Sequence, residues 1–581
     1  MEQKICQNCK GSFQIEADDF EFYKQVQTPP PTLCSNCRLE RRLVWRNEHG
    51  LFRRTNNTPG QNGQLISIFP DSANVTVYDH GYWWSDAWDA TEYGQEYDFS
   101  RPFFEQFKEL MHRVPLISLF DSKGVNNSYC NTVVEHKNCY MVTAGWTNED
   151  SIYSNRISFC KETTDSYICH KTEFGYDNVY CSDSYRLFYS EFAQNCADSY
   201  FLYDCRGCTD CFMSSNLRNK SYYFRNQQLS KEEYKQAMTE LDLDKYESIQ
   251  KFKEEFKSMK ANAIQRFAHL TNCVNVVGDN VDNSRDAKYI FDLPGGVEHA
   301  KYCNWGTYGL KDSYDTGPGT GGKSELTYEG ISIGVANARC KFGAILWNAH
   351  DVDYAFNCYT INNCFGCVSL RNKAYCILNK QYSKEEYEAL VPKIIEHMNA
   401  MPYIDHNGVV YKYGEFLPGD ISPFPYNATV AQDYIPSTPE KAKSRGYGWE
   451  EEAERNYVAT KQGSELPQSI NDVDDSILKE VIACENASQN KVGCTKAFRI
   501  VQQELTFYKR IGIPLPHLCP KCRHYERVAK KNPMKLWKRS CMCTLPNHDH
   551  SGKCLNEFET TYSPDRTEKV FCESCYQKEV L

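Results

Sequence analysis

The chain has 581 residues, of which 14% are aromatic and 24% charged, and it contains 29 cysteines. This composition is too aromatic for a disordered chain, and no apolar run approaches the ~20 residues that a membrane-spanning helix requires. The N-terminal residues lack an apolar secretory segment, so we expect a cytoplasmic protein whose cysteines bind metal or are buried as thiols.

Residues 1–95 are expected to form a zinc-binding module. Two residues separate Cys6 from Cys9, and two separate Cys34 from Cys37. Two such pairs supply the four thiolates of a closed tetrahedral shell, which is typical of structural Zn²⁺. A second metal site in this module is expected to be degenerate because it has no thiols, and we expect the aromatic segment 83–88 to replace it by packing.

Residues 96–400 are expected to form a β-solenoid that is built twice. Phrases such as Asp-Ser-Tyr recur, and residues 217–234 resemble 370–387 at an offset of 153. Short strands separated by polar corners suit stacked coils, although their spacing is too irregular to set the coil length or handedness. We expect a leading helix and first solenoid unit over 96–229, a capping helix over 230–269, a second unit over 270–382 and another capping helix over 383–400.

Each capping helix is predicted to begin with a capping box, in which a serine is followed three residues later by a glutamate. The two boxes are Ser230 with Glu233 and Ser383 with Glu386.

The central cysteines are expected to be interior thiols that act as small apolar side chains. Cys205, Cys208 and Cys211 also have the spacing of a metal-cluster motif, and this alternative stays open.

Residues 317–324 fit the phosphate-loop pattern, which includes Lys323. That chemistry needs a buried strand before the loop and a helix after it, so that backbone amides converge on phosphate. The residues before this loop are polar, and those after it alternate as in a strand. We therefore expect a glycine-rich turn, with nucleotide binding as a third functional candidate.

Residues 401–480 are expected to be a proline-rich linker with an acidic helix near 450–454. Residues 481–581 are expected to be a second zinc-binding module, because residues 494–523 match residues 9–38 at a constant offset of 485.

The second module has candidate ligands for two metal sites, so about three structural Zn²⁺ sites are expected in the whole chain. The first site comprises Cys484, Cys494, Cys519 and Cys522. For the second site we favour His550, Cys554, Cys572 and Cys575, with Cys541 and Cys543 as competitors and His548 as a further candidate.

Basic stretches follow the second cysteine pair in each module. The net charge of −10 combines −19 over residues 55–483 with +2 over residues 1–54 and +7 over residues 484–581. Such stretches can bind the phosphates of a nucleic acid, or they can be solvated helix faces. The candidate nucleic-acid-binding residues are Arg38, Arg41, Arg42 and Arg46 in the first module and Arg523, Arg527, Lys530 and Lys531 in the second.

Several phrases together resemble a known family. They are TrpTrpSerAsp (83–86), AsnCysPheGlyCys (363–367), LeuArgAsnLys (370–373), GluLeuThrPheTyr (504–508) and CysGluSerCysTyr (572–576). The set is similar to a cysteine-rich zinc-knuckle and zinc-ribbon family common in small-genome uncultivated bacteria of the candidate phyla, some of whose members carry an acyl-CoA-transferase (CaiB/BaiF-like) label. The resemblance covers nearly the whole chain, and it implies architecture and localisation rather than an activity. It also implies cysteine pairs at the second N-terminal site, which this chain lacks.

The sequence thus predicts a mainly β protein with some α: a duplicated β-solenoid-like centre flanked by treble-clef or zinc-ribbon-like modules at both ends. We expect a non-catalytic zinc-binding scaffold or adaptor that binds a macromolecule, with RNA or the ribosome as the first candidate partner. The alternative is an enzyme or ligand-binding protein that uses the solenoid groove, and self-association stays open. Cysteine tetrads explain the zinc expectation, but no catalytic residue is predicted.

Overall fold

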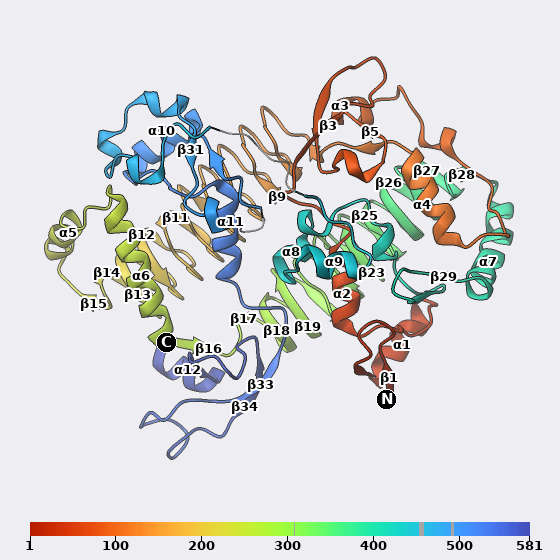
Figure 1. Ribbon diagram of the computed structural model, residues 1–581. Coiled ribbons are helices and arrows are strands. Elements are labelled where there is room, and N and C mark those ends of the chain that lie inside the picture. The colour runs from red at the N-terminus through yellow and green to blue at the C-terminus, as the bar shows by residue number, and fades with distance from the viewer. Residues whose placement is uncertain (307, 452–457, 490–492, 581) are drawn as a thin grey trace.

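The computed structural model describes residues 1–306, 308–451, 458–489 and 493–580. The protein is mixed α/β, with more strand than helix, and it is dominated by two parallel β-ladders that lie side by side (Figure 1). The terminal segments pack against these ladders. Among the described residues, no helix combines the length and the apolar character needed to cross a membrane.

The first ladder, residues 121–228, pairs each segment in parallel with the segment twelve residues later. Asp121 pairs with Val133 and Thr209 with Ser221, and isolated parallel bridges carry the same offset between the strands. Its strands are β7 (Asp121–Ser122), β8 (Asn131–Val134), β9 (Thr143–Trp146), β10 (His170–Glu173), β11 (Ser182–Phe188), β12 (Ala197–Tyr203), β13 (Thr209–Ser215), β14 (Ser221–Phe224) and the antiparallel β15 (Gln227–Gln228).

Left-handed residues bend this ladder at regular intervals. Every third residue from Lys123 to Arg225 has a positive φ, so four left-handed residues fall within each twelve-residue step of the pairing, which we call a winding. Each left-handed non-glycine residue costs about 1–2 kcal/mol. Hydrogen bonds between windings offset this cost: the N–H of Lys137 donates to the carbonyl of Asn148, and the N–H of Asn138 donates to that of Val125.

Small polar side chains fill the interior of the windings. The Cys139 thiol donates to the carbonyls of Lys137 and Asn148, both at 3.5 Å. The Ser154 hydroxyl donates to the carbonyls at the same relative positions, Ile152 and Thr163, at 3.0 and 3.3 Å. The cysteines at 130, 139, 160, 169, 181, 196, 205, 208 and 211 are all buried, as expected for interior side chains.

The second ladder, residues 270–381, has a less regular register. The offset is 11 residues between Val274 and Arg285, 14 between Leu310 and Ser324, and 12 between Tyr359 and Arg371. Its strands are β17 (Leu270–Thr271), β18 (Val274–Asp282), β19 (Arg285–Leu293), β20 (Val297–Lys301), β21 (Leu310–Thr316), β22 (Ser324–Glu325), β23 (Tyr328–Ile333), β24 (Ala338–Lys341), β25 (Ala344–Trp347), β26 (His350–Val368), β27 (Arg371–Ile377) and β28 (Lys380–Gln381).

The phosphate-loop pattern lies at the widest offset of the second ladder. Strands β22 and β23 follow residues 317–324, and no helix begins there. Because a phosphate loop depends on the N-terminus of the following helix, the candidate nucleotide site is wrong. The expected glycine-rich turn followed by extended structure is confirmed.

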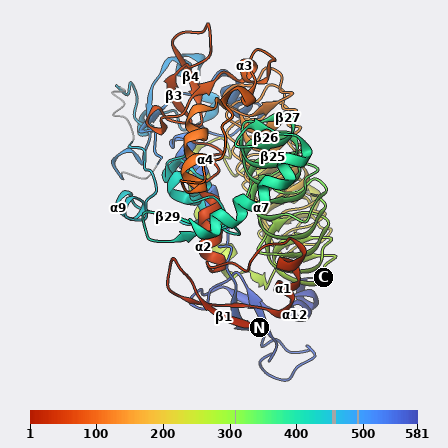
Figure 2. The same cartoon turned by 90° about the vertical axis from the view of Figure 1, so that its right-hand side faces the viewer.

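Three helices follow the ladder segments and flank them, namely α5 (Lys231–Thr239), α6 (Tyr246–Asn262) and α7 (Lys384–Ala400). Both predicted capping boxes are present, at Ser230 and Ser383. α6 packs Phe252 against Phe212 on the face of the first ladder, and α7 lies along the second ladder (Figure 2).

The segment that follows α7 is folded rather than extended. It contains β29 (Tyr403–Ile404), β30 (Val410–Tyr411), α8 (Val430–Tyr434) and α9 (Pro439–Ser444). Phe416, Leu417 and Tyr426 are fully buried, so this segment contributes to the core that the N-terminal region shares with the second ladder. The predicted acidic helix near 450–454 falls mostly outside the described residues.

The two terminal regions each place a helix on one ladder. Helix α2 (Ser35–Leu43) contacts β21 and β23 of the second ladder, whereas α11 (Pro520–Ala529) lies over the first ladder (Figure 1). The other N-terminal elements are β1 (Glu2–Ile5), β2 (Ser12–Ile15), α1 (Ala17–Gln25), β3 (Phe52–Thr55), β4 (Gln64–Ser67), β5 (Val77–Tyr78), α3 (His80–Trp84), α4 (Phe103–Arg113) and β6 (Leu116–Ile117). The others near the C-terminus are β16 (Ile264–Arg266), β31 (Ile482–Ala483), β32 (Ala497–Phe498), α10 (Gln502–Ile511), β33 (Trp537–Ser540), β34 (Glu557–Thr560), β35 (Lys569–Phe571) and α12 (Glu573–Val580).

Candidate metal centres and the cleft between the ladders

The first predicted cysteine tetrad is brought together at the N-terminus of α2. Cys6, Cys9, Cys34 and Cys37 converge, with the sulfurs of Cys9 and Cys34 3.7 Å apart. Cys34 is the N-cap residue of α2, and its N–H donates to the Cys6 sulfur at 3.3 Å. Hydrogen bonds from Cys37 and other neighbours lower the pKa of the Cys34 thiol to about 5, which favours the thiolate form that binds metal.

The second tetrad, Cys484, Cys494, Cys519 and Cys522, has the same construction at α11. Cys519 is the N-cap residue, and its N–H donates to the Cys484 sulfur at 3.3 Å. The sulfurs of Cys484 and Cys522 are 3.8 Å apart. Hydrogen bonds from Cys484 and Cys522 lower the pKa of the Cys519 thiol. Cys484 thus joins this tetrad although it lies ten residues before Cys494, whereas Cys6 lies three residues before Cys9.

The third tetrad differs from the favoured set in one ligand. Cys541, Cys554, Cys572 and Cys575 converge at the start of α12, so Cys541 takes the place predicted for His550. The N–H of Cys572 donates to the Cys541 sulfur at 3.3 Å, and the sulfurs of Cys554 and Cys572 are 4.0 Å apart. Burial raises the pKa of Cys572, but hydrogen bonds from Ser574, Asn556 and Cys575 outweigh it and lower the pKa to about 6.

The three tetrads have the dimensions of a tetrahedral zinc–thiolate shell. A Zn–S bond of about 2.3 Å gives neighbouring sulfurs in a tetrahedron a separation of about 3.8 Å, against 3.7, 3.8 and 4.0 Å here. Four thiolates fill such a shell and leave no position for water. These groups can hold metal ions, and their donor set is that of structural zinc.

A second group of ligands lies beside the third tetrad. Cys543, His548, His550 and Cys575 also come within bonding reach of a common centre. Cys543 and His550, which the sequence left as alternatives for one site, thus belong to a separate set that shares Cys575 with the tetrad.

The arginines predicted to bind nucleic acid are buried. Each of the six is at most 6% exposed. Arg38 and Arg42 of α2 both bind Asp315 of the second ladder, with Arg38 Nε and Arg42 Nη1 each 3.0 Å from a carboxylate oxygen. Arg523 and Arg527 of α11 bind Asp165 of the first ladder in the same way, at 3.1 and 2.9 Å. We call each such arrangement an arginine clasp.

The remaining predicted basic residues also have internal partners. Arg41 binds Glu329 and Glu415 at 2.7 and 2.6 Å. Arg46 binds Glu48 at 2.7 Å, and Lys530 binds Asp177 at 3.0 Å. The Lys531 amine is buried over the ring of Tyr434, and burial lowers its pKa to about 7. The prediction of a phosphate-binding surface is corrected for these residues, because their charged ends are directed at internal carboxylates and a ring.

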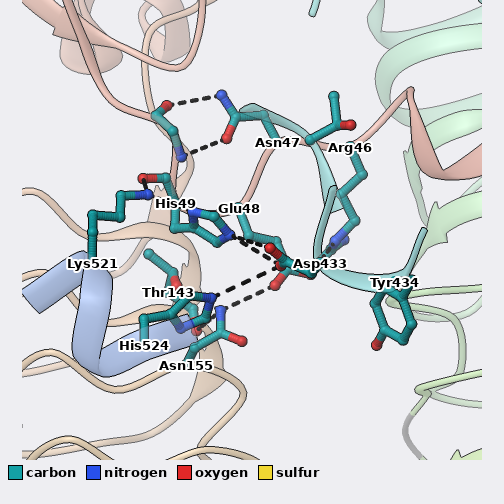
Figure 3. A network of polar contacts seen from close by, with 12 residues as sticks. Arg46, Asn47, Glu48, His49, Thr143, Asn155, Asp433, Tyr434, Lys521 and His524 are labelled. Carbon is teal, nitrogen blue, oxygen red and sulfur yellow. Dashed lines mark hydrogen bonds and ion pairs between the residues drawn. The ribbon is translucent and has the colours of Figure 1, made fainter. Parts of the chain in front are cut away.

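His49, Asp433 and His524 form a polar junction between the two halves of the molecule (Figure 3). His49 Nε2 is 3.0 Å from Asp433 Oδ2, and His524 Nε2 is 3.9 Å from it. The amine of Lys521 lies 2.5 Å from His49 Nδ1 and 2.6 Å from its carbonyl. The junction ties the segment that follows α2, helix α8 and helix α11 together.

A cleft of about 720 Å³ lies between the two ladders. Its aromatic lining includes Phe159 of the first ladder and Tyr308 of the second, which are 47% and 53% exposed. Charged groups include Lys323 and Asp292, and burial raises the pKa of Asp292. Clefts that combine apolar walls with a few polar groups are the usual form of a ligand site.

Comparison with known proteins gives no direct guide to function. No protein-family model matches this chain, and no curated protein matches it. The features that bear on its function are the tetrads, the clasps and the cleft.

Proposed function

We propose that the protein is a non-catalytic, zinc-stabilised scaffold that binds a macromolecule. In this proposal the two ladders are β-solenoids, and the terminal modules are treble-clef-like folds, each with a cysteine at the N-cap of a helix. The observation that carries the proposal is the position of the first two tetrads. Each tetrad begins a helix whose arginines clasp a buried aspartate of a ladder.

This geometry supports a structural role for zinc. Closed thiolate shells supply folding energy rather than a reactive metal-bound water. Metal at the first two tetrads would fix α2 and α11 in the position that lets the clasps form. All 29 cysteines lie in the part of the chain that the structure describes, and none of them forms a disulfide there. Free thiols in this number support a reducing compartment such as the cytoplasm.

The partner we propose is RNA, bound through the part of the C-terminal basic stretch that remains on the surface. Lys535 and Lys538 are exposed on and beside β33, and Trp537 lies between them. Cations next to an aromatic ring are typical of single-strand binding. With the arginines buried, this small patch predicts few phosphate contacts and weak, salt-sensitive binding.

The test is binding of mixed single-stranded RNA to the zinc-loaded protein across a salt series. The double variant Lys535→Gln/Lys538→Gln should reduce the slope of log affinity against log salt by about 1.4, since each contact contributes ~0.7 on single strands. The control is Lys171→Gln/Lys311→Gln, which removes two exposed lysines from the ladders. No binding at low salt, or equal slopes for both variants, would reject RNA as the partner.

The cleft favours a second candidate function, binding of a small apolar ligand between the solenoids. Its partly exposed Phe159 and Tyr308 face the cleft from different ladders. The fluorescent probe 8-anilinonaphthalene-1-sulfonate should bind the native protein, and Phe159→Ala should weaken this binding severalfold. Unchanged probe binding in Phe159→Ala would place the bound probe elsewhere.

A further inference from the structure

A long irregular loop joins the last antiparallel strand pair. Ser540 at the end of β33 pairs with Glu557 at the start of β34, and residues 541–556 between them contain no helix or strand. Irregular loops of this length are uncommon in compact folds unless something holds them. This loop carries four sulfur or imidazole ligands in addition to Cys541, namely Cys543, His548, His550 and Cys554.

These ligands divide into two groups that meet at one thiol. Cys541 and Cys554 face Cys572 and Cys575 in the third tetrad, whereas Cys543, His548 and His550 face Cys575 from the other side. The Cys543 sulfur is 3.4 Å from His548 Nδ1, and the Cys575 sulfur is 3.4 Å from His550 Nε2. Both separations are the length expected between two ligands of one tetrahedral ion.

The far nitrogen of each imidazole has an acceptor as its partner. His550 Nδ1 lies 2.9 Å from the carbonyl of Gly552, to which it donates. His548 Nε2 lies 3.0 Å from a carboxylate oxygen of Glu579 in α12. Metal-binding histidines characteristically donate their second N–H to a carbonyl or carboxylate, which directs the lone pair of the other nitrogen at the metal.

The junction at His49 provides an internal contrast. There the far nitrogen, Nδ1, faces the Lys521 amine, and the near nitrogen, Nε2, lies 3.0 Å from the Asp433 carboxylate. A lysine that donates to Nδ1 leaves the proton on Nε2, where it is donated to Asp433. Although this group also has the spacing of metal ligands, its hydrogen bonds are those of an ion-free contact. The imidazoles at 548 and 550 have the opposite arrangement.

We propose that the C-terminal module holds two metal ions bridged by the thiolate of Cys575. One ion occupies the third tetrad, and Cys543, His548, His550 and Cys575 bind the second, a Zn²⁺-class ion in a two-sulfur, two-nitrogen shell. Because the two ions share one thiolate, the site holds five thiolates where two separate shells would hold six. Less negative charge therefore accumulates around the two doubly charged ions. The second ion would fasten the 541–556 loop to α12.

This inference goes beyond the proposed function, because it concerns a fourth ion. The competing explanation is that the two groups are alternative shells for a single ion. The two explanations differ by one metal equivalent per chain.

The first test is the zinc content of the full-length protein after removal of loosely bound metal. The wild type should hold four equivalents, and Cys543→Ser and His548→Gln should each hold three. Thr544→Ala, an exposed neighbour in the same loop, is the matched control and should hold four. Three equivalents in the wild type, or no loss in either variant, would overturn the second ion.

The second test needs no variant and so does not depend on how well a variant folds. Full-length protein loaded with ¹¹³Cd should give four NMR signals: three from all-sulfur shells and one displaced upfield by its two nitrogen ligands. The displaced signal should show coupling to one of the other three through the shared sulfur. Three all-sulfur signals would overturn the second ion, and four signals without coupling would overturn the bridge.

Discussion

Helices α2 and α11 dock on different ladders, each through an arginine clasp, but the acidic residues around the two clasps differ. In each clasp two arginines one turn apart hold one buried aspartate. Around Asp315, Glu329 also binds Arg41 and Arg42. Around Asp165, Glu504 also binds Arg523, whereas Arg527 has that aspartate as its one carboxylate partner among the described residues.

The feature that the two docked helices have in common is the buried aspartate. A buried guanidinium needs a charged partner, because its removal from water costs several kcal/mol. In each clasp the aspartate satisfies that need for two arginines. Glu329 gives Arg42 a second carboxylate and Glu504 gives Arg523 one, but Arg527 has none among the described residues. The N-terminal clasp is therefore the more redundant of the two.

The largest effect is expected from loss of zinc, which should detach the terminal module that holds the affected tetrad. Structural zinc sites contribute about 10 kcal/mol or more of apparent binding energy, which matches the whole stability of a typical domain. We expect Cys34→Ser to release the N-terminal module and Cys519→Ser to release α10 and α11, with one zinc equivalent lost from each. Limited proteolysis with metal analysis checks this. Protection of α11 in Cys519→Ser would show that the clasp holds without metal.

Removing the clasp aspartates tests the redundancy directly. Asp165→Asn should destabilise the protein by about 3–5 kcal/mol, since it leaves Arg527 buried without a carboxylate. Asp315→Asn should cost less, because Glu329 still reaches Arg42 at 3.2 Å. Urea unfolding measures both. A larger loss for Asp315→Asn would contradict the comparison.

Glu48 joins the two halves, and its effect should depend on pH. Burial raises its pKa, but Arg156 and Arg46 outweigh burial and lower it from 4.5 to about 2. A lowered pKa contributes stability above the unfolded value, and this is lost as the pH falls from about 4.5 to 2. The contribution is about 3 kcal/mol at neutral pH. The stability gap between wild type and Glu48→Gln should therefore narrow between pH 6 and pH 3, and a constant gap would assign it to packing.

The helix caps should give the smallest and most equal effects. Ser230 and Ser383 each accept a hydrogen bond from the N–H three residues later, at 3.2 Å in both. Ser230→Ala and Ser383→Ala should each cost about 1 kcal/mol. Because the two caps match in geometry, unequal losses in denaturant unfolding would show that the helices differ in how they support their ladders.

The sequence predicted the features that depend on short-range spacing. The cysteine pairs, the capping boxes and the strand after residue 324 follow from neighbouring residues. The buried clasps could not be predicted, because Asp315 lies 277 residues from Arg38, and nothing nearby distinguishes a docked arginine from a solvated one. His550 was favoured over Cys541 for the third tetrad, and this was wrong because only the fold decides which side of Cys575 each one faces.

The spacing of the central cysteines also carries a signal for the first ladder. Successive central cysteines from Cys130 to Cys211 are separated by multiples of three residues. The same multiple separates the left-handed residues. An interior position recurs every three residues and not once per twelve-residue winding. The spacing between phrases such as Asp-Ser-Tyr is irregular for this reason.

The N-terminal helix α2 docks on the second ladder and the C-terminal helix α11 docks on the first. This arrangement has a consequence for the synthesis of the chain. Contacts within the windings span about a dozen residues and can form as the chain emerges, but Asp165 meets Arg527 across 362 residues. At about 5–20 residues per second, this interval lasts roughly 20–70 s. Throughout that time the first ladder exposes a carboxylate and the aromatic surface that α10 and α11 later cover. We therefore expect the risk of aggregation to be highest while the chain is still attached to the ribosome, before its last module is synthesised.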